Sequence, residues 1–492
     1  MPSGRHKKYD TLIRDVLVLD GSGGEPRRAD VALLEHHIAC VAEPGSLDAA
    51  SATVCHEGAG LALAPGFIDV HSHDDALVIH QPKMAPKLSQ GVTTVIVGNC
   101  GISAAPVTLA GDPPEPMNLL GPASAFAYPT FAEYVRAVER AQPAINVAAL
   151  VGHTALRSNH LDRLDRPARP AEIDAMQGQL REALAGGALG LSTGLAYANA
   201  SAAPTEEVMA LAEPLAEAGA LYCTHLRSEF AAVLEAMEEA FRIGRRAGVP
   251  VIVSHLKCAG VENHGRAGEV LGALDSAEAS QSVGCDCYPY SASSSNLDLQ
   301  QVTATTQILI TWSEPHPDLG GKRLAEIAAL WGMDLLEAAR RLQPAGAVYF
   351  GMDSGDVERI LSHPLTAIGS DGLPNDPLPH PRLWGTFPRV LGHYVRERRL
   401  FSLAEAVRKM TGLSADRYGL AQRGYIRAGY WADLVLFDPE TIQDLATFSQ
   451  PKQPAQGITA VWVNGALSWK DRAYTGARAG HFLRRGAMAT TH

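Results

Sequence analysis

The chain has 492 residues, of which 42 are basic and 53 are acidic, so its formal charge is −11. This acidic balance argues against non-specific nucleic-acid binding, which needs clustered positive charge. The hydrophobic fraction of 46% is normal for a globular protein. A chain of this length can bury a large core and form more than one domain.

The first residues of the chain show no targeting pattern. They include basic residues, but no apolar segment follows them, so we expect no signal peptide. No apolar run approaches the roughly 20 residues needed to span a bilayer, and no membrane partner is expected. The seven cysteines are scattered and odd in number, which favours a reducing, cytoplasmic location, although a periplasmic one by another route stays open.

Both ends of the chain consist of short strand patterns. Near the N-terminus the run Leu12–Leu19 ends at the turn signal Asp20-Gly-Ser-Gly-Gly, and short apolar segments follow it. Similar segments recur at 434–437 and 458–465. We therefore predict one small β-sandwich domain. Its two parts are residues 1–64 and 416–492.

The middle of the chain alternates eight short apolar runs with amphipathic helical segments. This alternation predicts parallel βαβ units, and eight units predict a (β/α)8 barrel over residues 65–415. About 80 residues separate the last two runs, more than a βα unit needs, which predicts an insertion subdomain at about 291–347 over the barrel mouth. The runs are Phe67–Val70, Thr93–Val97, Asn146–Val151, Leu189–Leu191, Leu221–Thr224, Val249–Val253, Ser282–Cys285 and Leu365–Ile368.

Two histidines follow the first of these runs with one residue between them. Alternate residues of a strand point to the same face, so His71 and His73 should aim together beyond the end of the strand. Imidazole is a common ligand of divalent transition metals. Two such histidines alone could equally well make ordinary hydrogen bonds.

Four further strand ends carry candidate metal ligands. Barrel enzymes place their sites at the carboxyl ends of the strands, and the second, fifth, sixth and eighth runs lead to Cys100, His225, His255 and Asp371. Each residue alone has a structural explanation, as a buried thiol, a hydrogen-bonded histidine or a turn residue. Six candidates on one ring of positions are improbable by chance.

A thiolate and imidazoles together suit zinc. Cys100, His225 and His255 could form a site with three protein ligands and an open fourth position, which is typical of catalytic zinc. His71 and His73 could hold a second metal together with the carboxylate after the eighth run, and this second site could be weak or empty.

At these positions the chain resembles the amidohydrolase superfamily, and within it the D-aminoacylases, also called N-acyl-D-amino-acid deacylases. The likeness covers nearly the whole chain. The two histidines are specific only to the superfamily, whereas a cysteine in place of the usual bridging lysine carbamate is far more specific, as is the stretch 371–388. The segments that carry the likeness are Ala64–Asp74, Gly91–Ser103, Thr224–Glu229, Gly369–Pro374 and Pro379–Pro388.

The resemblance implies a zinc hydrolase that splits N-acyl-D-amino acids into a carboxylate and a free D-amino acid. It implies a tight zinc site at Cys100, His225 and His255, and a looser second site at His71 and His73. Only the resemblance, and no feature of the residues themselves, indicates the D hand.

The resemblance also implies roles around the reacting amide. Zinc would polarise the carbonyl group and lower the pKa of bound water towards about 7. Asp371 would act as general base and then as general acid. Arg382 offers a bidentate fork to the free carboxylate of the substrate, and Lys257 adds a point charge. The residues implied around that carboxylate are Lys257, Tyr288, Ser294 and Arg382.

The substrate side chain and two alternative functions remain open. The stretch Tyr288–Gln307 contains no Arg or Lys, which favours neutral or apolar side chains over acidic ones. A cyclic amidase, like a hydantoinase or dihydroorotase, would share the barrel but use a carbamylated lysine, and Cys100 argues against it. An inactive scaffold would be expected to lack ligands.

The expected partner is a small-molecule substrate. The oligomeric state is open, and a monomer is one possibility. His153 and Tyr197 have no assigned role.

Overall fold

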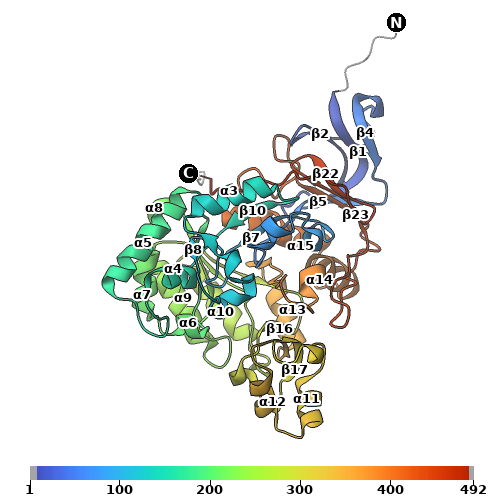
Figure 1. The fold of residues 1–492 in the computed structure, drawn as a ribbon. Helices are drawn as coiled ribbons and strands as arrows, with labels where there is room; N and C mark the ends of the chain where they lie inside the picture. Colours follow the sequence, from blue (N-terminus) through green and yellow to red (C-terminus); the bar gives the residue numbers. More distant parts are fainter. Residues whose placement is uncertain (1–7, 487–492) are drawn as a thin grey trace.

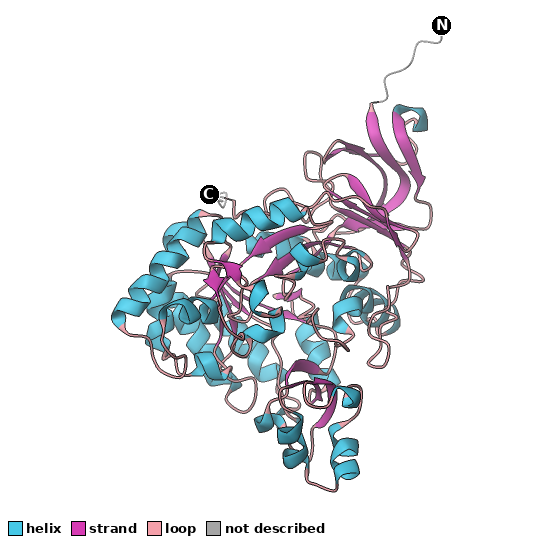
Figure 2. Ribbon diagram, viewed as in Figure 1, coloured by secondary structure: helices cyan, strands magenta, loops and turns pink. Residues whose placement is uncertain are grey.

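The computed structural model describes residues 8–486 and has three parts. A barrel of parallel strands surrounded by helices forms the centre, a β-rich domain lies at one side, and a small subdomain projects from the barrel (Figure 1). Figure 2 shows that strands dominate the lateral domain and helices the periphery of the barrel. In this range no helix is long and apolar enough to cross a membrane.

Eight parallel strand positions form the barrel, as the sequence predicted, and each predicted run coincides with an observed strand. The third position is interrupted at Leu150, so that β10 pairs with β7 and β11 pairs with β12. An isolated bridge between Ser72 and Gly372 joins the last strand to the first. In order, the strands are β6 (Phe67–Asp69), β7 (Val92–Val97), β10 (Asn146–Ala149) with β11 (Val151–Gly152), β12 (Gly190–Gly194), β13 (Leu221–His225), β14 (Val251–Val253), β15 (Val283–Cys287) and β19 (Thr366–Ile368).

Helices between the strands bury apolar faces against the barrel. In α9 (Val233–Ala247) the buried residues recur every three or four positions, and the helix ends at Gly248, whose φ of 68° suits a left-handed cap. A capping box of Thr130 and Glu133 begins α3 (Phe131–Ala141). The other helices here are α1 (Leu77–His80), α2 (Ala85–Leu88), α4 (His153–His160), α5 (Pro170–Ala185), α6 (Ala198–Ser201), α7 (Thr205–Ala212), α8 (Pro214–Ala218), α10 (Ala267–Glu278), α13 (Ser354–Ser362), α14 (Arg382–Arg389), α15 (Leu403–Met410) and α16 (Gly412–Tyr418).

Segments from both ends of the chain form one nine-stranded sheet. The two segments meet where β5 (Ala62–Pro65) pairs with β20 (Leu434–Phe437). A separate apolar core, which includes Ile13, Val31 and Trp462, supports this sheet. The remaining strands are β1 (Tyr9–Val18), β2 (Arg27–Leu34), β3 (His37–Ala42), β4 (Ala52–Glu57), β21 (Ile458–Val463), β22 (Ala466–Lys470) and β23 (Ala473–Tyr474).

A subdomain between β15 and β19 has its own antiparallel sheet and core. β18 (Ala345–Phe350) pairs with β16 (Ser293–Asn296) on one side and with β17 (Gln307–Ser313) on the other. The helices α11 (Leu324–Trp331) and α12 (Leu335–Leu342) pack on this sheet, as Figure 1 shows. The sheet begins six residues after β15 ends, so the subdomain adjoins the carboxyl ends of the barrel strands.

Candidate metal centre

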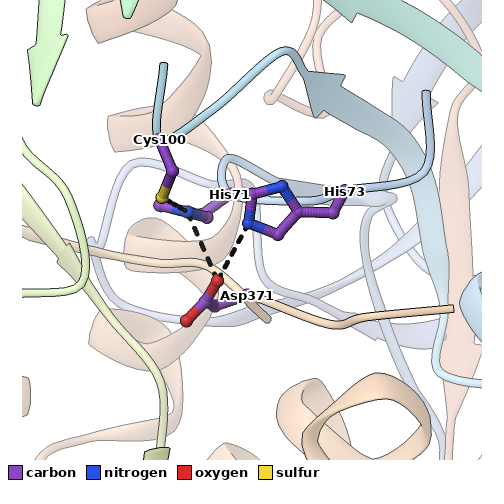
Figure 3. Close-up of side chains that lie close together, drawn as sticks. All are labelled: His71, His73, Cys100 and Asp371. Carbon is purple, nitrogen blue, oxygen red and sulfur yellow. Dashed lines mark hydrogen bonds and ion pairs between the residues drawn. The ribbon is translucent and has the colours of Figure 1, made fainter. Parts of the chain in front are cut away.

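The candidate ligands predicted from the sequence meet at the carboxyl ends of the barrel strands. Cys100 follows β7, His225 ends β13, His255 follows β14, and Asp371 follows β19. The two histidines after β6, His71 and His73, lie beside Cys100 and Asp371 (Figure 3). All are buried except His225, whose side chain is 12% exposed. The barrel thus brings residues that are up to 300 positions apart in the sequence into one cluster of ligand atoms.

Two overlapping groups of donor atoms have the spacing that a metal ion needs. In one group the ligand atoms of Cys100, His225 and His255 all lie within 4.8 Å of one another. The second group contains His71, His73, Cys100 and Asp371 within the same limit. Cys100 therefore belongs to both groups, and its thiolate could contact an ion at either position.

Short contacts connect the two groups. The Cys100 Sγ atom lies 3.2 Å from His71 Nε2 and 3.3 Å from His255 Nε2. Asp371 Oδ1 lies 3.1 Å from His73 Nε2 and 3.5 Å from His71 Nε2 (Figure 3). The atoms that face one another are those that coordinate zinc in proteins, so the donor set fits that metal.

The surroundings keep Cys100 and Asp371 ionised. Burial raises the pKa of the Cys100 thiol, but His71 and His255 outweigh it and hold that pKa well below its usual range. Burial likewise raises the pKa of Asp371, and Arg382 and His255 outweigh it, so this pKa is also held low. The thiolate and the carboxylate are the forms that bind a metal.

Three site residues adopt a backbone conformation that is uncommon outside glycine. The φ angles are +54° at Cys100, +36° at His255 and +50° at Asp371. Such residues cost free energy and cluster at functional sites, where the surrounding structure holds them in place. Here each of the three lies two or three residues after a barrel strand, and its side chain joins the cluster of ligand atoms.

Two further carboxylates, for which the sequence alone indicated no role, orient the histidines: Asp286, which is buried, and Glu229, whose side chain is 12% exposed. Asp286 lies 3.2 Å from His71 Nδ1 and accepts a hydrogen bond from the His255 backbone N–H at 2.9 Å. Glu229 Oε1 lies 2.9 Å from His255 Nδ1 and 2.5 Å from Lys257 Nζ. Carboxylates commonly hold metal-binding histidines in this way. An acidic residue within the apolar strand β15 was the available signal for Asp286.

The four residues implied for substrate binding lie together beside Asp371. The Arg382 guanidinium lies 4.6 Å from the centre of the Tyr288 ring, and Lys257 Nζ lies 5.6 Å from it. Arg382 Nη1 pairs with Asp371 Oδ2 at 2.9 Å, and Nη2 donates to the Ser294 carbonyl at 3.1 Å.

Several polar atoms of this second cluster are buried without a partner within residues 8–486. They are the Tyr288 hydroxyl, the Ser294 hydroxyl and Arg382 Nε. Buried donors are nearly always satisfied in folded proteins, so unpaired ones beside two cations indicate a place for an anionic ligand. The arrangement suits a carboxylate.

His153 and Tyr197 differ in their relation to the site. His153 Nε2 contacts Glu207 Oε1 at 3.2 Å, and burial lowers its pKa, so it belongs to a separate buried pair. The Tyr197 ring centre lies 4.8 Å from that of His225, which places Tyr197 at the edge of the metal centre.

The chain is similar along its length to several hydrolases. The profile of the amidohydrolase family matches residues 59–468. D-aminoacylase from Alcaligenes xylosoxydans xylosoxydans is 47% identical over 487 residues, which cover 99% of this chain and 100% of that protein. N-acyl-D-aspartate deacylase from the same organism is 50% identical over 479 residues, which cover 97% of this chain and 95% of that protein.

A solved structure of a deacylase is similar to this chain over the same length. N-acyl-D-glutamate deacylase from Bordetella bronchiseptica, complexed with zinc and a phosphonate inhibitor that mimics the tetrahedral intermediate, has a TM-score of 0.93 and 45% identity to this chain. The match covers 97% of this chain and 100% of that one. The resemblance seen in the sequence is therefore confirmed: this chain belongs to the amidohydrolase family, and within it to the D-aminoacylases, or N-acyl-D-amino-acid deacylases.

Proposed function

We propose that the protein is a zinc-dependent deacylase that hydrolyses the amide bond of N-acyl-D-amino acids to a carboxylate and a free D-amino acid. The observation that carries the proposal is the adjacency of two clusters, a thiolate–imidazole metal centre and a pair of cations with unpaired buried donors. An N-acyl-amino acid has an amide and a carboxylate on the same α-carbon, so the two groups are also adjacent and one could face each cluster. The names of the relatives support the same substrate class.

Cys100, His225 and His255 would hold the tightly bound zinc, and His71 and His73 would hold a looser second ion. When bound, zinc supplies Lewis-acid activation of the amide carbonyl and of water. The carboxylates of Asp286 and Glu229 keep the rings of His71 and His255 in place.

Asp371 would carry the proton during the reaction. Its Oδ2 atom pairs with Arg382, while Oδ1 faces the metal centre. Oδ1 can accept a proton from the attacking water and deliver it to the leaving nitrogen, which is general base and then general acid catalysis by one carboxylate.

Arg382, Lys257, Tyr288 and Ser294 would bind the carboxylate of the substrate. Arg382 supplies a planar pair of donors, Lys257 a compact charge, and the two hydroxyls further hydrogen bonds. The carboxylate and the amide carbonyl then fix two points of the substrate. The pocket around the side chain supplies a third point, and three points distinguish the D from the L hand.

We further infer a preference for neutral or apolar side chains, such as those of D-leucine, D-methionine and D-phenylalanine. The segment from Tyr288 to Gln307, which contains β16, has no Lys or Arg to pair with an acidic side chain. The two nearby cations, Lys257 and Arg382, are the ones proposed to bind the α-carboxylate, so they are not free for a second, acidic group.

A panel of N-acetyl amino acids of both hands tests the function. We expect release of acetate from D-leucine, D-methionine and D-phenylalanine derivatives, slower turnover of D-aspartate and D-glutamate derivatives, and none of L forms. Asp371→Ala should abolish turnover, whereas Asp376→Asn, a buried carboxyl in the same loop, should retain it. Equal turnover of L forms would refute the stereochemical assignment.

The two alternative functions give different results in the same assay. Hydrolysis of hydantoin or dihydroorotate rings in place of linear amides would indicate a cyclic amidase. Purified protein that contains no zinc and turns over nothing would indicate an inactive scaffold.

A further inference from the structure

Lys87 on α2 lies where the first and last strands of the barrel meet, and its side chain is completely buried. Its Nζ atom lies 2.7 Å from Asp69 Oδ2, 2.9 Å from Ser370 Oγ and 3.2 Å from Asp74 Oδ2. The three donors of the ammonium group thus face three acceptors. A buried cation is costly unless it is paired, and this one is paired on every side.

Each partner of Lys87 lies within two residues of a residue of the metal centre in the sequence. Asp69 Oδ1 accepts hydrogen bonds from the backbone N–H groups of His71 at 3.3 Å and Ser370 at 2.8 Å. Ser370 leads directly into Asp371, whose own N–H donates to the His71 carbonyl at 2.8 Å. The network therefore connects the segment that carries the histidines with the one that carries the proposed base.

This network lies at the junction that has the least backbone pairing. The other neighbouring strands of the barrel share ladders of at least two residue pairs. Between β6 and β19 the described part of the chain has no such ladder, only the isolated bridge of Ser72 with Gly372 and the hydrogen bond from the Asp371 N–H to the His71 carbonyl. Side chains must therefore fix the relative position of these two strands.

We propose that Lys87 is a positioning residue that sets the separation between the histidines at 71 and 73 and the carboxylate of Asp371. The inference rests on the proposed function, because it assigns Asp371 to the reaction. Lys87 itself touches no proposed ligand or substrate group; it acts through Asp69 and Ser370.

Lys87→Met and Ser370→Ala test the proposal, with Lys409→Met as a matched control. Lys409 is equally buried, but it contacts the Thr366 carbonyl at 3.4 Å, at the opposite end of β19. We expect Lys87→Met and Ser370→Ala to lower kcat about 10- to 100-fold, the usual effect of losing such a supporting contact, with KM within about twofold. Lys409→Met should lower thermal stability and leave kcat unchanged.

If Lys87 had a purely structural role, Lys87→Met would lower the yield of folded enzyme but would leave kcat per folded molecule unchanged. If Lys87→Met fails to fold, Ser370→Ala decides, because it leaves no buried charge unpaired. A kcat within twofold of wild type in Ser370→Ala, or a matching loss in Lys409→Met, would overturn the proposal.

A second measurement does not depend on activity. In crystals of Ser370→Ala we expect the distance between His73 Nε2 and Asp371 Oδ1, 3.1 Å here, to exceed the hydrogen-bond limit of about 3.5 Å. If wild type turned over no N-acyl-D-amino acid, the proposed function would fail, and the role of Lys87 would then be tested by this distance alone. An unchanged distance in Ser370→Ala would overturn that role.

Discussion

The pKa of each buried cysteine in this protein depends on the groups that surround its thiol. Seven cysteines are free, and five of them are buried. Burial raises the pKa of Cys223 and Cys287 above the usual range, so these thiols remain protonated and pack as small apolar groups. Cys100 is equally buried, yet His71 and His255 reverse the direction of its shift. Among the five buried cysteines, only Cys100, which faces imidazoles, therefore favours the thiolate.

This contrast predicts the effect of replacing single thiols by hydroxyls. Cys100→Ser should lose most of its zinc at equal protein concentration, because a serine hydroxyl at neutral pH is a far weaker zinc ligand than a thiolate. Cys223→Ser, two residues before His225 on β13, should keep its zinc. Metal analysis of the purified variants measures both, and an unchanged zinc content in Cys100→Ser would remove this residue from the ligand set.

Ser294 offers a second comparison between neighbours. Its hydroxyl is buried and unpartnered within residues 8–486, whereas Ser293 on the opposite face of β16 is partly exposed. Ser294→Ala should raise KM about tenfold or more, since a hydrogen bond to a charged group contributes about 1.5–3 kcal/mol, and kcat should change little. Ser293→Ala should behave as wild type in steady-state kinetics. Equal effects of the two changes would contradict the assignment of Ser294 to the substrate carboxylate.

The segment after β19 attaches the barrel to the inserted subdomain through one buried carboxyl. Asp376 Oδ2 accepts a hydrogen bond from Thr311 Oγ1 of β17 at 2.9 Å, while Oδ1 has no hydrogen-bond partner in the described range. Burial raises the pKa of Asp376 from 3.8 to about 7, against the opposing effects of Thr311, the Leu378 N–H, Lys452 and Arg382. In the folded protein this carboxyl therefore stays protonated up to a higher pH than in the unfolded chain.

This shift predicts how stability depends on pH. Because the folded pKa lies above the unfolded one, the contribution of Asp376 is fully present below about pH 4 and is lost as the pH rises through about 7. Asp376→Asn cannot titrate, so its stability relative to wild type should rise by about 2–3 kcal/mol between pH 5 and pH 8. Denaturant unfolding at both pH values measures this. A constant difference between variant and wild type would show that Asp376 does not titrate in this window.

The elements of the barrel could be predicted from the sequence because each depends on a local pattern. All eight apolar runs correspond to strands, since buried parallel strands need continuous apolar residues. The convergence of Cys100, His225 and His255 followed from a general property of barrels. Glu229 and Lys87 could not be assigned, because no local pattern indicates them and one partner of Lys87 lies 283 positions away. Asp286 stands out as an acidic residue in an apolar strand, but its partner His71 lies 215 positions away.

At the scale of the whole molecule, a segment near the C-terminus packs against the barrel at the end of β10 that lies away from the metal centre. Phe482 forms a bridge with Val147 of β10, and the Leu483 N–H donates to the Val147 carbonyl at 2.7 Å. Arg423 pairs with Asp433 and stacks on Trp431 at 4.7 Å, within the chain that leads into β20. The ligand side chains thus lie at one end of the barrel, while this C-terminal segment contacts β10 near its opposite end.

The metal centre should also stabilise the whole fold. Strands β7, β13 and β14 lead to the three proposed ligands of the tight zinc, so an ion bound there connects three separate strands of the barrel. Binding that occurs only in the folded state stabilises it by about 2.7 kcal/mol at a free metal concentration 100 times the dissociation constant. Removing zinc with a chelator should therefore lower the thermal unfolding midpoint, and adding zinc, but not magnesium, should restore it. The same treatment should leave Cys100→Ser almost unchanged, and an equal response in that variant would place the stabilising ion elsewhere.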